Sequence, residues 1–228
     1  MSFRKLAAVL LAGGLALAAC GQQSSLGSSG ASAPPVASGA SFPEGSTMAK
    51  LAAAGTVRVG TKFDQPLFGL KGLDGKPEGF DVEIAKIVSA KLGIPADKIT
   101  YTETPSKIRE DVLVNNQVDM VVATYTINDA RKQKISFAGP YYIAGQDLMV
   151  KADNTAITGP ESLKSANARV CSVSGSTPAK NITQYVDPAN IVLFDVYSKC
   201  ADALRNGQVE AVTTDNVILA GLVSTSQG

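Results

Sequence analysis

The sequence predicts an α/β fold built on a largely parallel sheet that helices cover on both faces. First, short runs rich in β-branched residues alternate with amphipathic helical segments from Thr47 onward. Second, the expected helix at residues 81–92 has apolar residues at helical spacing and is followed by Gly93 and Pro95, which end helices. Third, the run at residues 139–145, with its glycines and a proline, interrupts the alternation and marks a hinge between two lobes.

The expected elements follow one another along the chain. Strands are predicted at residues 57–60, 99–102, 120–123, 147–151, 169–173, 191–194 and 211–213. Helices are predicted at residues 48–54, 81–92, 107–115, 129–134, 160–165, 178–186 and 198–206. In the helix at 81–92, the face of Ile84, Ala85, Val88 and Leu92 is expected to be core. A ligand site is expected beyond the carboxyl ends of the strands and between the lobes.

The first 20 residues have the features of an export signal. Arg4 and Lys5 precede an apolar run at residues 6–19, which is shorter than the roughly 20 apolar residues that span a bilayer. Residues 17–20, Leu-Ala-Ala-Cys, resemble the lipobox of bacterial lipoproteins, so we expect residues 1–19 to be removed and Cys20 to carry lipid. The alternative is an ordinary cleaved signal with an incidental cysteine.

Residues 20–46, rich in Ser, Gly and Pro, are expected to form a flexible linker between the lipid and the folded part. No transmembrane helix is predicted. The protein is therefore expected on the outer face of the cell membrane, held by its lipid anchor, or in the periplasm.

Composition narrows the class of function. Cys171 and Cys200 remain once Cys20 is set aside, and an exported protein favours a disulfide between them. Two buried thiols or a zinc pair are the alternatives, and the absence of histidine argues against zinc. The same absence removes the usual general base, so catalysis is not favoured. Without Arg4 and Lys5 the chain keeps 19 basic against 20 acidic residues, so nucleic acid is not an expected partner.

Residues 121–135 place hydroxyls and an arginine where a strand passes into a helix. Asn128 is expected to cap the helix, and Arg131 falls in its first turn, where the helix dipole disfavours a cation. A bound carboxylate would account for Arg131, with Thr124 and Thr126 beside it. The alternative is a surface arginine in a run of basic residues.

Further candidates follow other strands. Lys62 comes after the first strand and Arg109 opens the helix after the second, so two cations face one crevice, although either could be a solvated surface charge. In the second half, Thr177 could cap a helix that Pro178 begins, which would make an anion-binding helix N-terminus or a plain turn. Asp215 ends another strand, where it could pair with an ammonium group or cap the next helix.

From Thr56 to Gly228 the chain resembles the family 3 extracytoplasmic solute-binding proteins of ABC transporters, and within them the glutamate/aspartate binders. Residues 79–85, GFDVEIA, resemble the family signature, and residues 126–131 resemble its Thr-Ile-Thr-x-x-Arg stretch. Residues 174–177 and 207–215 resemble the second-lobe loop and the terminal Asp. The resemblance implies a two-lobed periplasmic-binding-protein-like (type II) fold with a ligand cleft between the lobes. Its parts would be the N-terminal part of lobe 1 at residues 47–140, a hinge at 141–145 and an incomplete lobe 2 at 146–228.

The resemblance also implies a site for an L-α-amino acid. Arg131 would hold the α-carboxylate, assisted by Thr126 and by Thr177 from the other lobe. Asp215 and the carbonyl of Thr124 would take the α-ammonium group. The implied ligand-binding set is Lys62, Arg109, Thr124, Thr126, Arg131, Ser176, Thr177 and Asp215.

Selectivity would come from two cations. Lys62 and Arg109 stand where the glutamate/aspartate binders place positive charge against the side-chain carboxylate, which implies an acidic ligand. Gln65 and Ser106 occupy positions where many neutral and basic amino-acid binders carry aromatic residues, which weakens a hydrophobic or aromatic ligand. Phe80, although part of the signature, is expected in the core.

The family continues past the length seen here through a second hinge strand that completes the first lobe. We therefore expect the second half of lobe 1 to be missing, with apolar surface and a sheet edge exposed. The implied partners are L-glutamate or L-aspartate, the permease of an ABC importer and the membrane through the lipid anchor. The protein would be a monomer without a metal or cofactor.

Three alternatives remain at this stage. A glutamine or asparagine receptor would be distinguished by the absence of charge complementarity at Lys62 and Arg109. A dehydratase related to the cyclohexadienyl dehydratases would need an acid or base in the cleft, for which Glu103 is the nearby carboxylate. A sensor domain that reports to a kinase is the third.

Overall fold

The computed structural model of the chain describes residues 33–226. The predicted signal peptide at residues 1–19, the lipidation of Cys20 and the linker as far as residue 32 lie outside the described residues. Within residues 33–226, no helix is both long enough and apolar enough to cross a membrane.

The strands of the first part form two small sheets. In one, β1 (Val57–Thr61) lies between β5 (Ile99–Glu103) and β6 (Met120–Val121) and is parallel to both. In the other, β2 (Asp64–Gln65), β3 (Gly69–Lys71) and β4 (Pro77–Glu78) are antiparallel. The accompanying helices are α1 (Thr47–Ala54), α2 (Phe80–Lys91), the 3-10 helix η1 (Ala96–Lys98), α3 (Arg109–Val114) and α4 (Asp129–Lys132). We call this part lobe 1.

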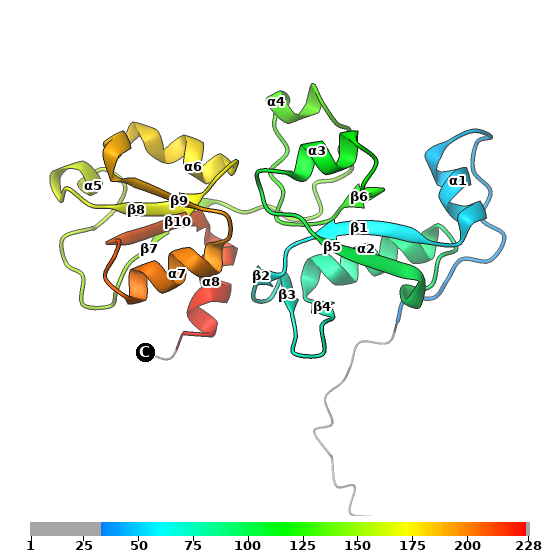
Figure 1. Ribbon diagram of the computed structural model, residues 1–228, viewed down its shortest axis with the longest axis horizontal. Helices are drawn as coiled ribbons and strands as arrows, with labels where there is room; N and C mark the ends of the chain where they lie inside the picture. Colours follow the sequence, from blue (N-terminus) through cyan, green and yellow to red (C-terminus); the bar gives the residue numbers. More distant parts are fainter. Residues whose placement is uncertain (1–32, 227–228) are drawn as a thin grey trace, which may run out of the picture. The chain divides into compact units, whose positions relative to one another are not determined.

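The second part, which we call lobe 2, contains one sheet of four strands in the order β7-β10-β8-β9. The strands are β7 (Gln146–Met149), β8 (Val170–Val173), β9 (Ile191–Phe194) and β10 (Ala211–Asp215), and only β7 is antiparallel to its neighbour. The helices are α5 (Ser162–Ser165), α6 (Thr177–Asn181), η2 (Ile182–Gln184), η3 (Pro188–Asn190), α7 (Tyr197–Arg205) and α8 (Asn216–Ser224). Figure 1 shows α6 on one face of this sheet and α7 and α8 on the other. The predicted two-lobed α/β fold is confirmed.

Each lobe has its own apolar core. In lobe 1, Val57 and Val59 of β1 pack against Ala85 of α2 and against Ile94 and Val122. In lobe 2 the sheet is buried on both sides, and its main clusters are those of Val170 with Leu163 and Ile182, of Val212 with Leu204 and Leu219, and of Val173 with Tyr197 and Ile218. All four residues of β8 are buried, as expected for a strand that helices cover on both faces.

The predicted disulfide is present between Cys171 of β8 and Cys200 of α7, and both residues are fully buried. In the chain-entropy model a loop of this length contributes roughly 3 to 4 kcal/mol to stability.

Two predictions about α2 were wrong in detail. Its buried face is formed by Val82, Ala85 and Ser89, whereas Val88 is 39% exposed. Phe80 is also 39% exposed, because it begins the helix and packs edge-on against Phe68 and Tyr142 rather than inside the core.

The start of α6 also differs from the prediction. Ser176, not Thr177, is the cap, and its hydroxyl accepts a hydrogen bond from the backbone N–H of Ala179 at 3.0 Å. Thr177 is therefore the first helical residue, and its hydroxyl is available for contacts outside the helix.

Candidate functional site

The strands of the first sheet in lobe 1 end at one edge. Thr61 lies opposite Glu103 and Gly60 opposite Val121, so the residues that follow β1, β5 and β6 are brought together. The strands and the segments that follow them are tightly packed here, since a Cβ added at Gly60 would lie 2.6 Å from the Thr104 side chain. This is the edge at which the sequence placed Lys62, Ser106 and Thr124.

Lys62 is the first buried cation at this edge, with a relative exposure of 1%. Its ammonium group donates to the hydroxyl of Ser106 at 3.0 Å. Burial, and then the positive charge of Arg109, lower the pKa of Lys62 to about 7. The carboxylates of Asp64 and Glu103 oppose this change more weakly.

Arg109 is the second buried cation, with a relative exposure of 2%. One of its terminal nitrogens donates to the carbonyl oxygen of Thr124 at 2.9 Å, and the guanidinium lies 3.9 Å from the centre of the Tyr125 ring. Burial, and then Arg131, lower the pKa of Arg109 to about 10. Its Nε is buried without a hydrogen-bond partner among the described residues.

Arg131 is the third cation, and the helix cap predicted before it is present. Asn128 caps α4 by accepting from the backbone N–H of Arg131 at 3.0 Å. The guanidinium pairs with Glu110 at 3.0 Å and donates to the carbonyl oxygen of Thr126 at 2.7 Å. The Thr126 side chain itself is exposed.

Arg131 also contacts lobe 2. It donates to the hydroxyl of Thr177 at 3.2 Å and to the carbonyl oxygen of Gly175 at 3.0 Å. The structure therefore brings Arg131 and Thr177 into contact, although they are 46 positions apart in the sequence. Ser176 of the same loop is occupied as the cap of α6.

A cleft of about 900 Å³ contains several of the remaining predicted residues, and Thr124, Thr126, Thr177 and Asp215 all line it. Asp215 precedes α8 but its side chain does not cap that helix. Burial raises the pKa of Asp215, while Arg109 and Arg131 lower it. Lys62 and Arg109 lie outside the lining of this cleft, and Arg131 lines a neighbouring opening of about 680 Å³ with Ser176 and Thr177.

Three further polar residues near these groups were not in the predicted ligand-binding set. Gln65 is fully buried, and its side-chain oxygen accepts a hydrogen bond from Thr124 at 2.8 Å. Glu110 is the partner of Arg131, and the spacing of 21 residues gave no local signal of that pair. Asp81 is 1% exposed, and burial raises its pKa to about 6, against the effect of a 2.7 Å hydrogen bond from Tyr141.

Within the described part of the chain, no group of three or more His, Cys, Asp or Glu side chains could hold an ion. The charged groups at this edge are three buried cations of lobe 1, and hydroxyl groups from both lobes lie near them.

Polar side chains from two α/β lobes thus meet at strand and helix ends, an arrangement that can surround a small ligand. The chain belongs to the bacterial extracellular solute-binding proteins, family 3, whose model matches residues 57–225.

Three similar proteins are named for different ligands. A glutamate-binding protein of Corynebacterium glutamicum is 39% identical over 178 residues, which are 76% of this chain and 60% of that protein. A glutamine-binding protein of Geobacillus stearothermophilus is 37% identical over 220 residues, covering 95% of this chain and 81% of that protein. The solved structure of an ancestral arginine-binding protein bound to arginine is 34% identical, with a TM-score of 0.69 over 75% of this chain and 74% of that one. The chain thus spans about 60% of the length of the glutamate-binding relatives that it matches.

Proposed function

We propose that this protein is an extracytoplasmic receptor that binds an acidic L-amino acid, glutamate or aspartate, and delivers it to an ABC importer. The observation that carries the proposal is the pair Lys62 and Arg109. Both are almost fully buried. Among residues 33–226, neither side chain has a carboxylate oxygen within 4.0 Å of its charged nitrogens, the limit for an ion pair. Because a buried charge without a counter-ion is costly, a ligand that brings a second carboxylate would compensate this pair.

The α-groups of the ligand would be held by other residues. Arg131 and Thr177 are candidates for the α-carboxylate, since they already meet at 3.2 Å and the guanidinium makes charge-assisted hydrogen bonds. The ligand would replace part of the present contact between Arg131 and lobe 2. Asp215, which lines the cleft, and the Thr124 carbonyl would accept from the α-ammonium group. Thr126 would contribute its carbonyl oxygen rather than its side chain, and Ser176 would contribute by holding the shape of its loop.

An amide ligand is the second candidate, and one observation favours it. A lysine with a pKa of about 7 is close to half neutral at neutral pH, and neutral Lys62 would not require a counter-ion. The glutamine-binding relative agrees with this alternative. Arg109, with a pKa of about 10, keeps its charge in either case, which is why we favour the acidic ligand.

The remaining parts of the proposal concern location and activity. We infer that residues 1–19 are removed and that Cys20 then carries a lipid anchor, followed by a linker at residues 20–46. We also place a hinge at residues 141–145, between lobe 1 at 47–140 and lobe 2 at 146–228. We also infer a binding role without turnover, in a monomer. For the dehydratase alternative, Glu103 is exposed at the end of β5, and Asp81 is the buried carboxylate to test by a turnover assay.

Isothermal titration of the chain, with its disulfide intact, against glutamate, aspartate, glutamine and asparagine tests the proposal. We expect binding of the acidic pair, and Lys62→Met and Arg109→Met should each weaken it by about 10- to 150-fold, as the loss of one charge-assisted hydrogen bond implies. Lys107→Met, which removes an exposed cation from the same loop, is the control and should change little. Equal or tighter binding of glutamine by the wild type would favour the amide receptor instead.

A further inference from the structure

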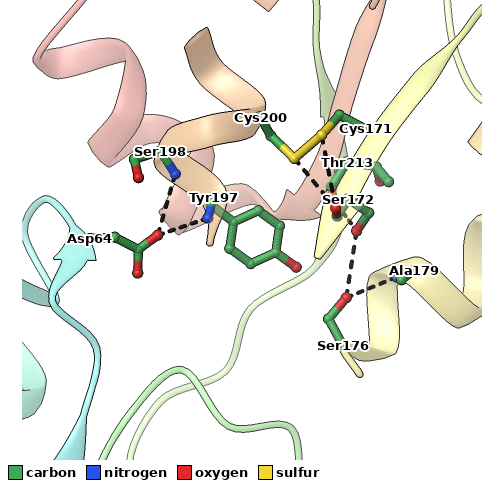
Figure 2. The surroundings of a disulfide bond; sticks show 9 residues. All are labelled: Asp64, Cys171, Ser172, Ser176, Ala179, Tyr197, Ser198, Cys200 and Thr213. Carbon is green, nitrogen blue, oxygen red and sulfur yellow. Dashed lines mark hydrogen bonds between the residues drawn. A yellow bond between two sulfur atoms is a disulfide. The ribbon is translucent and has the colours of Figure 1, made fainter. Parts of the chain in front are cut away.

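A carboxylate of lobe 1 caps a helix of lobe 2. Asp64 lies on β2, and its Oδ2 accepts hydrogen bonds from the backbone N–H groups of Tyr197 at 2.7 Å and Ser198 at 3.3 Å (Figure 2). These are the first two residues of α7, more than 130 positions away in the sequence. The first N–H groups of a helix have no partner within it and need an acceptor from elsewhere.

Helix α7 has no cap of its own. Its N-cap residue is Val196, which has no acceptor in its side chain, and its first turn contains no acidic residue. Asp195 lies just before the helix, but its carboxylate is paired with the ammonium group of Lys199 at 2.8 Å. Asp64 therefore supplies the hydrogen-bond acceptor and the negative charge that favour a helix N-terminus.

The two lobes also approach each other tightly near Asp64. A Cβ added at Gly221 of α8 would lie 2.4 Å from the carbonyl oxygen of Pro66, two residues after Asp64. On the other side, a Cβ at Gly175 would lie 2.7 Å from the Cα of Lys107. The hydrogen bonds of Asp64 consequently exist only while lobe 1 and lobe 2 are in contact, and separation of the lobes would return both partners to water.

The N-terminal turn of α7 is fixed to β8, and β8 in turn contacts the loop that contains Ser176. Cys200, in that turn, is joined to Cys171 of β8 by the disulfide (Figure 2). Ser172, which follows Cys171 in β8, donates a hydrogen bond from its hydroxyl to the carbonyl oxygen of Thr213 at 3.0 Å. The ring of Tyr197 lies between α7 and the loop of Ser176, and the residue is 2% exposed. The capped turn, β8 and the loop at Ser176 are thus expected to move as one body.

We propose that Asp64 is a latch for lobe closure, a positioning residue that raises ligand affinity without touching the ligand. It does so by capping α7 only in the arrangement in which the two lobes meet. The effect on affinity rests on the proposed function, whereas the capping itself does not. Lys62 of the neighbouring strand end is the charged group of the site that faces Asp64, so an electrostatic effect on Lys62 is the competing explanation.

Two substitutions separate these explanations. Asp64→Ala removes the cap, and we expect affinity for glutamate to fall by about two- to thirtyfold, the range that loss of a helix cap gives, mostly through faster dissociation. Asp64→Asn keeps a good capping oxygen but removes the charge, so its affinity should stay near that of the wild type. Asp195→Ala is the matched control, because it removes an exposed carboxylate from the same helix end within lobe 2. Equal losses in the Ala and Asn variants would overturn the latch in favour of an effect on Lys62.

Amide hydrogen exchange at Tyr197 and Ser198 tests the latch without any ligand. We expect faster exchange of these two amides in Asp64→Ala than in the wild type, Asp64→Asn or Asp195→Ala. Equal exchange in the wild type and Asp64→Ala would overturn the proposal. If the wild type bound no acidic amino acid, the proposed function would fail, and the exchange result would still decide whether Asp64 caps α7.

Discussion

Binding of an acidic ligand should be coupled to protonation of Lys62. Burial and the neighbouring charge of Arg109 hold the pKa of Lys62 at about 7. A ligand carboxylate placed against this ammonium group would favour its charged form and raise the pKa. The protein should therefore take up a proton on binding whenever the pH lies between the two pKa values.

The size of this coupling follows from the pKa. At pH 8 a lysine with a pKa of about 7 is roughly one-tenth protonated, so binding should take up about 0.9 proton and affinity should fall about tenfold from pH 8 to pH 9. At pH 6 the uptake should be near 0.1 proton, because Lys62 is already charged. Arg109, with a pKa of about 10, and Asp81, with a pKa of about 6, lie outside the window from pH 8 to pH 9.

Calorimetry in buffers of different ionisation enthalpy measures the proton uptake directly. The expected result at pH 8 is close to one proton for glutamate and none for the variant Lys62→Met. Tight glutamate binding at pH 8 without proton uptake would show that the ligand carboxylate does not contact Lys62, and the reasoning about the charge pair would fail.

Three further variants test the fold around the site. Replacing Cys171 and Cys200 by serine should lower the free energy of unfolding by roughly 3 to 4 kcal/mol, measured in urea, and an unchanged midpoint would contradict a contribution from the disulfide. Gly221→Ala should weaken ligand affinity while leaving secondary structure intact, because its Cβ would meet the Pro66 carbonyl at 2.4 Å and hold the lobes apart; unchanged affinity would mean that this contact is not part of the bound state. Asp81 has a pKa of about 6, raised from 3.8 by burial, so its contribution to stability increases as the pH falls. From pH 7.5 to pH 5 the wild type should gain about 1.4 kcal/mol relative to Asp81→Asn in urea unfolding, and parallel pH profiles would refute the shift.

The sequence predicted those elements whose signals are local. The strand at residues 191–194 was predicted with its bounds, and the helix at 198–206 was displaced by one residue, because apolar alternation and helical spacing act within a few positions. The sheet of β2, β3 and β4 was missed, since its strands are only two or three residues long and have no period. Helix α8 was also missed, because its sequence is apolar on nearly all sides and carries no amphipathic pattern.

The same distinction applies to the site. The cap of Asn128 on α4 could be predicted because donor and acceptor are three residues apart. The pairing of Arg131 with Glu110 and the contact of Asp64 with α7 could not, since each depends on how distant segments meet in the fold. Residue chemistry suggested candidate groups for the site, and tertiary packing determines which of them are buried.

A crystal structure of the protein with bound glutamate would test the central claim most directly. The account predicts the side-chain carboxylate within hydrogen-bonding distance of Lys62 and Arg109, with the α-carboxylate at Arg131 and the α-ammonium group at Asp215. A ligand whose side chain points away from Lys62 and Arg109, or density only for an amide ligand under the same conditions, would contradict it.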